Sequence, residues 1–358
     1  MTVGQDVLAR GGRAVRWPFH RRPLPLAVIG AAGLGVAILA AVGLGSVTVA
    51  PGDTLAILAH RLFLLDLPRT WSPTAETIVW DLRLPRALEA AVVGLGLAVA
   101  GTTFQGLLRN PLADPYVLGT ASGAALGAAI AVLLPVRVEI LGFGLLQLLA
   151  FVGAIAAVTL VYRLSRVTGG SPLTSLLLTG YALGSLLAAA LAMAMYLSGA
   201  ALRQIFSYLL GSFDNASWSE LGGALPIILI ASSLILLRSR TLNGLLLGED
   251  AAAHLGVDVR RERAILLGLA SLITAAAVSV SGLIGFVGLV IPHLVRMLVG
   301  PNARVVLPLA AIGGAILMIV ADLVARTLGE IPVGVITAVI GAPFFLVLLR
   351  RAQRGYEL

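Results

Sequence analysis

The 358-residue chain contains no cysteine and no lysine, so all 25 of its basic residues are arginine. Without cysteine, no disulfide, thiolate zinc site or cysteine nucleophile can form. Without lysine, the chain has no Walker A loop, whose lysine reaches the nucleotide phosphates, and no Schiff-base chemistry. If the protein uses ATP, we therefore expect a separate chain to hydrolyse it.

Charge is also scarce: 12% of the residues are charged and 59% are hydrophobic, and the mean hydropathy is +1.01. A soluble globular domain has about 25% charged and roughly 45–50% apolar residues. The composition excludes a water-soluble enzyme, a disordered chain and a collagen-like fibre, and it predicts an all-α polytopic membrane protein embedded in a lipid bilayer. The net charge of +8 comes from arginines beside apolar runs, which is typical of topology signals. We expect no nucleic-acid partner, because no separate basic domain exists.

Long apolar runs recur along the chain, and a helix that crosses a bilayer needs about 20 such residues. We expect about ten transmembrane helices, at residues 24–50, 87–107, 115–134, 140–162, 173–197, 221–237, 264–281, 284–299, 305–325 and 332–349. The first run is too long for a signal peptide and lacks a clear cleavage pattern. The eighth contains Gly285, Gly288 and Pro292, which can break it or make it re-entrant. Glycines at 119, 123 and 127 predict a small-residue face for close helix packing.

The arginines predict the orientation of these helices. Eighteen fall on the predicted inside and seven on the predicted outside, and cytoplasmic loops carry the excess of positive charge. The predicted organisation is a basic cytoplasmic segment (1–23), a single transmembrane domain (24–351) and a cytoplasmic tail (352–358), with both termini cytoplasmic. The longest cytoplasmic connection spans residues 238–263.

Two connections carry further information. Arg109, Asn110, Pro111, Asp114 and Pro115 predict a structured tight turn, since the prolines break a helix and the Asn and Asp side chains cap its neighbours.

In the second connection, Glu249 and Asp250 favour the start of a short alanine-rich helix, Gly256 ends it, and a second short helical piece is expected at 257–263. On spacing alone, this connection is equally compatible with a solvated loop and with a docking surface.

Several of these segments resemble one known family, the FecCD-type permeases. The resemblance runs from about residue 24 to residue 351 and is carried by RLPRALEAAVVG (83–94), QGLLRNPLADPYVLGTASGAALGA (105–128), LLGEDAAAHLGVDV (246–259), GLIGFVGLVIPHLVRMLVG (282–300) and IPVGVITAVIGAPFFLVLLRR (331–351). These permeases are the membrane subunits of ATP-binding-cassette (ABC) importers for iron–siderophore complexes, haem and cobalamin.

The resemblance implies a BtuC-like ABC importer permease fold with ten helices, in a bacterial or archaeal cytoplasmic (inner) membrane. It implies a second permease subunit in a homodimer, two copies of an ABC ATPase inside and an extracytoplasmic substrate-binding protein outside. The chain would be a transporter subunit without a cofactor and not an enzyme. We expect its substrate to be an iron chelate, either a ferric siderophore or haem, with cobalamin as the alternative.

The resemblance also assigns residues to roles. The ATPase-coupling segment comprises Gly248, Glu249, Asp250, Ala251, His254, Leu255, Gly256 and Val257. The candidates for docking the binding protein are Arg326, Arg61 and Arg69, although Arg326 can instead pair with Asp322 four residues earlier. The translocation pathway would include Leu183, Leu187, Leu191, Met195 and Leu197, for which ordinary helix packing is the alternative.

Two other functional classes are alternatives to this interpretation. An ion-coupled secondary transporter normally needs ionisable residues near the middle of the bilayer, whereas Glu89, Asp114 and Asp322 are predicted near the ends of spans. An intramembrane enzyme would need paired carboxylates, a serine–histidine constellation or a metal cluster, and the sequence shows none at helical spacing. The four histidines are scattered, so no metal site is expected.

Overall fold

The structure is a computed structural model of the whole chain, and it describes residues 23–45, 47–64, 68–136, 138–165 and 172–354. The predicted basic segment, apart from residue 23, and the last four residues of the predicted tail lie outside this part of the chain. The described part is overwhelmingly helical, apart from one two-stranded hairpin, β1 (Glu139–Ile140) and β2 (Phe143–Gly144).

Ten apolar helices correspond in order to the ten predicted runs, which confirms the all-α membrane fold. They are α1 (Pro23–Gly43), α4 (Leu84–Leu107), α5 (Thr120–Leu133), α6 (Leu145–Ser165), α7 (Pro172–Leu197), α9 (Trp218–Leu237), α12 (Val259–Ser281), α13 (Val287–Val299), α14 (Ala303–Thr327) and α15 (Val333–Arg354). Seven of the described helices are long and apolar enough to cross a membrane, and α5, α13 and the apolar part of α15 are shorter.

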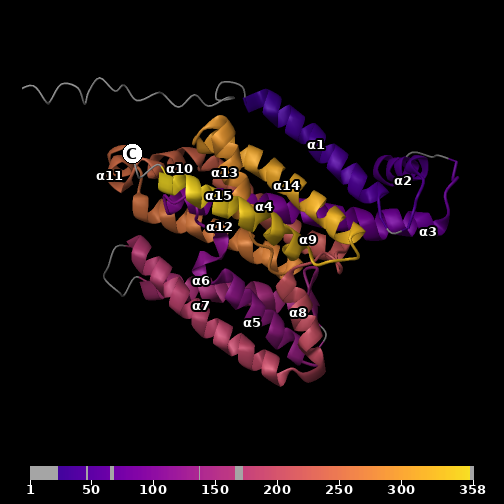
Figure 1. Cartoon of the computed structure of the whole chain (residues 1–358), viewed down its shortest axis with the longest axis horizontal. Coiled ribbons are helices and arrows are strands. Elements are labelled where there is room, and N and C mark those ends of the chain that lie inside the picture. The colour runs from indigo at the N-terminus through magenta and orange to yellow at the C-terminus, as the bar shows by residue number, and fades with distance from the viewer. Residues whose placement is uncertain (1–22, 46, 65–67, 137, 166–171, 355–358) are drawn as a thin grey trace, which may run out of the picture.

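Most of the remaining helices lie at the ends of these spans. At one end are α2 (Pro51–Phe63), α3 (Pro73–Glu76), the 3-10 turn η3 (Gly199–Ala201) and α8 (Leu202–Leu210), and at the other are α10 (Ser239–Leu246) and α11 (Glu249–His254). The 3-10 turn η2 (Pro115–Leu118) lies inside the bundle before α5, where Pro115 approaches Gly288 of α13. Figure 1 shows α10 and α11 at the opposite end of the molecule from α2 and α3. Following the predicted topology, we call the α10–α11 end the inner end and the α2–α3 end the outer end.

Three boundaries differ from the sequence prediction. Helix α1 ends at Gly43, not near Ala50, since Pro51 already starts α2. The second span begins earlier, because α3, the π-helix η1 (Thr77–Arg83) and α4 form one helix of 35 residues from Pro73 to Leu107. The prediction of a second short helical piece at 257–263 is wrong: Asp258 caps α12 by accepting a hydrogen bond from the amide of Arg261, and this helix runs from Val259 to Ser281.

Helix α4 forms the centre of the bundle and packs against α9, α12, α13 and α14 (Figure 1). Glycine makes this close packing possible. A Cβ atom on Gly94 would overlap the carbonyl group of Gly314 on α14, and one on Gly101 would overlap Gly288 on α13. Small residues let helix backbones approach closely in membranes. The small-residue face predicted on α5 does the same, since Gly123 meets Gly153 of α6.

Candidate functional site

At the inner end, α10 and α11 form a compact unit that we call the coupling unit (residues 239–257). The buried side chains of Leu242, Leu245 and Ala252 face the bundle. Two leucines at the edges of α11 point away from it, with Leu247 71% exposed and Leu255 67% exposed. The unit therefore presents apolar surface on the side of the protein that the predicted topology places in the cytoplasm.

All eight residues of the predicted coupling segment fall in or directly beside α11. Gly248 precedes the helix with φ 116°, a conformation that favours glycine. His254, Leu255 and Gly256 are exposed at its far end, and Gly256 has φ 81°. The segment is thus a short, well-defined helix with tight glycine corners and not an extended loop.

Polar contacts attach the coupling unit to the membrane helices. Glu249 forms an ion pair with Arg263 of α12, and Arg238 lies 3.3 Å from Glu262 on the same helix. The Asn243 Nδ2 atom donates to Asn302 Oδ1 at 2.9 Å, and its Oδ1 atom accepts from the amide of Ala303 at 2.7 Å. Polar contacts therefore tie α10–α11 to both α12 and the start of α14.

The predicted tight turn lies against this unit. The Asn110 side chain accepts a hydrogen bond from the amide of Leu112 at 2.9 Å, and Asp114 accepts one from the amide of Tyr116 at 2.8 Å. Arg109 adopts φ 47°, and its guanidinium lies 3.6 Å from the position that a Cβ on Gly248 would occupy. Two segments that are distant in sequence therefore meet at the inner end.

At the outer end, most of the predicted docking arginines are engaged within the chain. Asp322 is 1% exposed and lies 3.1 Å from Arg326, which is itself 10% exposed, so the local pair that the sequence left open is present. Asp322 also lies 2.9 Å from Arg86. Arg61 lies 2.7 Å from Glu76, while Arg69 is exposed.

The predicted pathway residues lie mostly on the packed side of α7. Leu183 and Leu187 line an apolar cavity of about 290 Å³ together with α5 and α6. Leu191 and Met195 pack near Ile205 of α8, and only Leu197, at the end of the helix, is exposed. The first four of these side chains therefore take part in ordinary helix packing. The open face of α7 carries other side chains, namely Leu178, Tyr181, Met193 and Tyr196.

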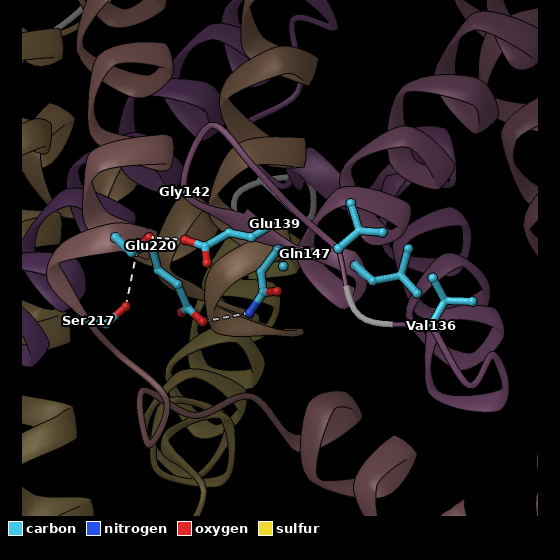
Figure 2. A pocket seen from close by; sticks show the side chains of 10 residues that line it. Val136, Glu139, Gly142, Gln147, Ser217 and Glu220 are labelled. Atoms are coloured by element: carbon cyan, nitrogen blue, oxygen red, sulfur yellow. Dashed lines mark hydrogen bonds between the residues drawn. The ribbon is translucent and has the colours of Figure 1, made fainter.

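A polar pocket of about 530 Å³ lies at the outer ends of α6 and α9, beside the β1–β2 hairpin. Figure 2 shows the carboxyl groups of Glu139 and Glu220 on one side of this pocket and Val136 on the other. Ser219 donates to Glu139 at 2.6 Å, and Gln147 donates to Glu220 at 2.6 Å. Sequence reasoning missed this pocket, because it joins residues of separate connections.

Comparison with known proteins decides the family. Residues 33–351 match the FecCD transport family. The chain belongs to this family. The cobalamin import system permease protein BtuC of Halobacterium salinarum is 46% identical over 77% of this chain and 74% of its own length. The hemin transport system permease protein HmuU of Yersinia pestis is 44% identical over 80% of this chain and 88% of its own length.

A solved structure agrees with these relatives. It shows an inward-facing conformation of a metal-chelate type ABC transporter, with a TM-score of 0.78 and 33% identity over 91% of this chain and 99% of that one. The predicted BtuC-like ABC permease fold is thereby confirmed. This FecCD protein is a multi-pass membrane protein and the permease subunit of an ABC importer.

Glu89 is an ionisable residue of the second span. It lies near the outer end of that span, in agreement with the sequence prediction, because it follows Arg86 by one turn and interacts electrostatically with Arg86, Asp322 and Glu220, which are at the outer end. Its side chain is fully buried, and neither of its oxygens has a hydrogen-bond partner in the part of the chain that the structure describes. An ionisable residue inside a membrane helix is by default a functional candidate.

Proposed function

We propose that this permease translocates a bulky metal chelate across the cytoplasmic membrane, as a homodimer powered by two copies of a separate ABC ATPase. The substrate is a ferric siderophore or haem, with cobalamin as the alternative of the same fold. The exposed apolar side of the coupling unit carries this proposal. The coupling unit lies beside Arg109 and is attached to α12 by an ion pair and to the start of α14 by hydrogen bonds. These contacts suit a surface that transmits movement of the ATPase to the membrane helices.

An extracytoplasmic binding protein delivers the substrate at the outer end. Exposed Arg69 is available to a carboxylate of the binding protein. To bind such a carboxylate, Arg61 must release Glu76, and Arg326 must release Asp322. Asp322 is buried and pairs with both Arg86 and Arg326, so separating it from an arginine is costly. Arg69 is therefore the docking candidate that requires the least rearrangement within this chain.

The translocation pathway runs along the open face of α7, between the two subunits. Tyr181 is 78% exposed in the single subunit and lies on this face with Leu178 and Met193. The surface is apolar with tyrosine hydroxyls, which suits weak contact with a passing chelate. Leu183, Leu187, Leu191 and Met195 support this wall from behind, where they pack against neighbouring helices.

The absence of cysteine from the chain makes the pathway directly testable. A Tyr181→Cys variant is expected to react with a water-soluble maleimide in proteoliposomes, since only a thiol in contact with water ionises to the reactive thiolate. Labelling is expected to block uptake. Leu187→Cys on the packed face is the matched control and is expected to stay unlabelled. An unreactive cysteine at 181 would place this face in lipid and contradict the proposed pathway.

The substrate is tested by uptake into proteoliposomes that contain the permease, its ATPase and its binding protein. Radioactive ferric siderophore, haem and cobalamin are compared with ATP inside the vesicles. Uptake of an iron chelate that requires ATP and both partners supports the proposal, and uptake of cobalamin alone selects the alternative. A second candidate, an ion-coupled secondary transporter, is favoured only by buried Glu89, and it predicts uptake without ATPase under a proton or sodium gradient.

A further inference from the structure

Two membrane helices are too short to cross the bilayer alone. Helices α5 and α13 contain 14 and 13 residues, which span only about 20 Å at about 1.5 Å per residue. The hydrocarbon core is about 30 Å thick. Irregular backbone completes both crossings: η2 precedes α5, and residues 282–286 connect α12 to α13. We call residues 282–286 the α12–α13 break.

The two irregular segments meet through one side chain. The Tyr116 hydroxyl of η2 donates to the carbonyl oxygen of Ile284 at 2.9 Å and accepts from the amide of the same residue at 3.2 Å. Next to it, Pro115 lies so close to Gly288 that a Cβ atom there would be 2.9 Å from the Pro115 Cγ atom. Non-helical backbone at membrane depth needs partners from the surrounding protein, and Tyr116 supplies both for Ile284.

The α12–α13 break is held in a conformation that its own sequence does not favour. Gly282 has φ 68°, and Phe286 has φ 70° although it is not glycine. A left-handed bulky residue is strained and persists only where its surroundings impose it. The amide of Leu283 donates to the Tyr208 carbonyl oxygen at 3.4 Å on the other side of the break. The segment therefore depends on outside contacts, of which Tyr116 makes two.

The other end of this connection reaches the coupling unit. Six residues separate Arg109, which lies beside Gly248, from Tyr116. The intervening turn is stiffened by Pro111, Pro115 and the Asp114 cap on the amide of Tyr116. Movement of the coupling unit at the inner end is thus applied, through a short stiff segment, to the residue that holds the α12–α13 break.

We propose that Tyr116 is a positioning residue that couples ATPase-driven movement of the α10–α11 unit to the α12–α13 break and, because η2 packs against α7, to the helix that lines the proposed translocation route. The inference rests on the proposed function. When the coupling unit moves, Arg109 carries the turn with it, and the Tyr116 hydroxyl pulls on or releases Ile284. The strained break then changes conformation within the membrane.

The test is Tyr116→Phe in the full complex of permease, ATPase and binding protein in proteoliposomes. Both ATP hydrolysis and uptake are measured, with the substrate that the wild-type complex transports. We expect uptake to fall about tenfold while the ATPase rate stays within about twofold, as for the loss of one coupling contact. The number of ATP molecules hydrolysed per substrate transported therefore rises.

The control is Tyr208→Phe, which removes another buried hydroxyl beside the same break. The Tyr208 ring packs in the same apolar cluster as Tyr116, but its hydroxyl donates to the Val278 carbonyl oxygen of α12 at 2.9 Å and not to the α12–α13 break. The ATP-to-substrate ratio of this variant is therefore expected to remain at the wild-type value. Equal losses of uptake and hydrolysis in Tyr116→Phe, or an unchanged ratio, would overturn the proposal.

A second variant keeps the test decisive if Tyr116→Phe does not fold. Arg109→Gly removes the contact with the coupling unit from an exposed position, and glycine tolerates φ 47°. It is expected to raise the same ratio, and a wild-type ratio would contradict the proposed route. Failure of the proposed function is distinguishable, because the wild-type complex would then show no ATP-driven uptake at all.

Discussion

Loss of ATPase binding is the expected result of the Leu255→Asp substitution. Leu255 is 67% exposed directly after α11, and exposed Leu247 lies in the short connection between α10 and α11. A central apolar contact of an interface contributes about 2 kcal/mol or more when truncated, and a buried carboxylate adds a desolvation cost. We expect the affinity of the permease for its ATPase to fall at least about thirtyfold and ATP-driven uptake to be lost.

The measurement is titration of the purified ATPase onto permease in nanodiscs. Leu141→Asp is the matched control, because Leu141 is 87% exposed at the opposite end of the molecule, in the β1–β2 hairpin. Its φ of 53° suits aspartate as well as leucine. ATPase affinity is expected to be unchanged in the control. Wild-type affinity of Leu255→Asp, or an equal loss in both variants, would contradict docking on the coupling unit.

Gly94→Val is expected to have the largest effect on folding. A Cβ atom at this position overlaps the carbonyl group of Gly314 and the Met318 side chain, at the contact between α4 and α14. Backbone atoms cannot move aside without separating the two helices. Overpacking typically costs about 1–3 kcal/mol, and we expect the upper end of this range here. We expect a fall in melting temperature of roughly 5–10 °C, or no monodisperse protein.

Gly268→Val on α12 provides the comparison, because nothing lies within 4 Å of the added Cβ atom. Its melting temperature, measured by fluorescence in the same detergent, is expected to stay within about 2 °C of the wild type, since surface substitutions away from special features change stability little. A similar fall in both variants would contradict the α4–α14 contact as the cause, since valine has a better helix propensity than glycine and propensity alone would not lower the melting temperature.

Most of the helix count was predictable because a membrane span is encoded locally. A run of apolar residues long enough to cross the hydrocarbon is visible in the sequence, and all ten runs are helices. The ends of the helices were less predictable. The polar stretch at 73–83 continues into α4, and residues 259–263 continue into α12, since neighbouring structure can extend a helix beyond its apolar run.

Contacts between residues that are distant in sequence could not be predicted. Arg86 and Asp322 are 236 residues apart, and Tyr116 and Ile284 are 168 apart. Neither spacing carries a signal, whereas the Asp322–Arg326 pair has helical i,i+4 spacing and is therefore predictable from the sequence. The pathway prediction on α7 identified an apolar stripe but could not tell its packed side from its open side, because alanine and leucine occupy both.

The central claim is that ATP hydrolysis by a partner drives import through this permease. The most direct measurement is uptake of the metal chelate into proteoliposomes of the full complex, with ATP inside and again with a proton or sodium gradient alone. We predict uptake that requires ATP, the ATPase and the binding protein, and no uptake driven by a proton or sodium gradient alone. Uptake driven by a gradient without the ATPase, and lost in Glu89→Gln, would contradict it.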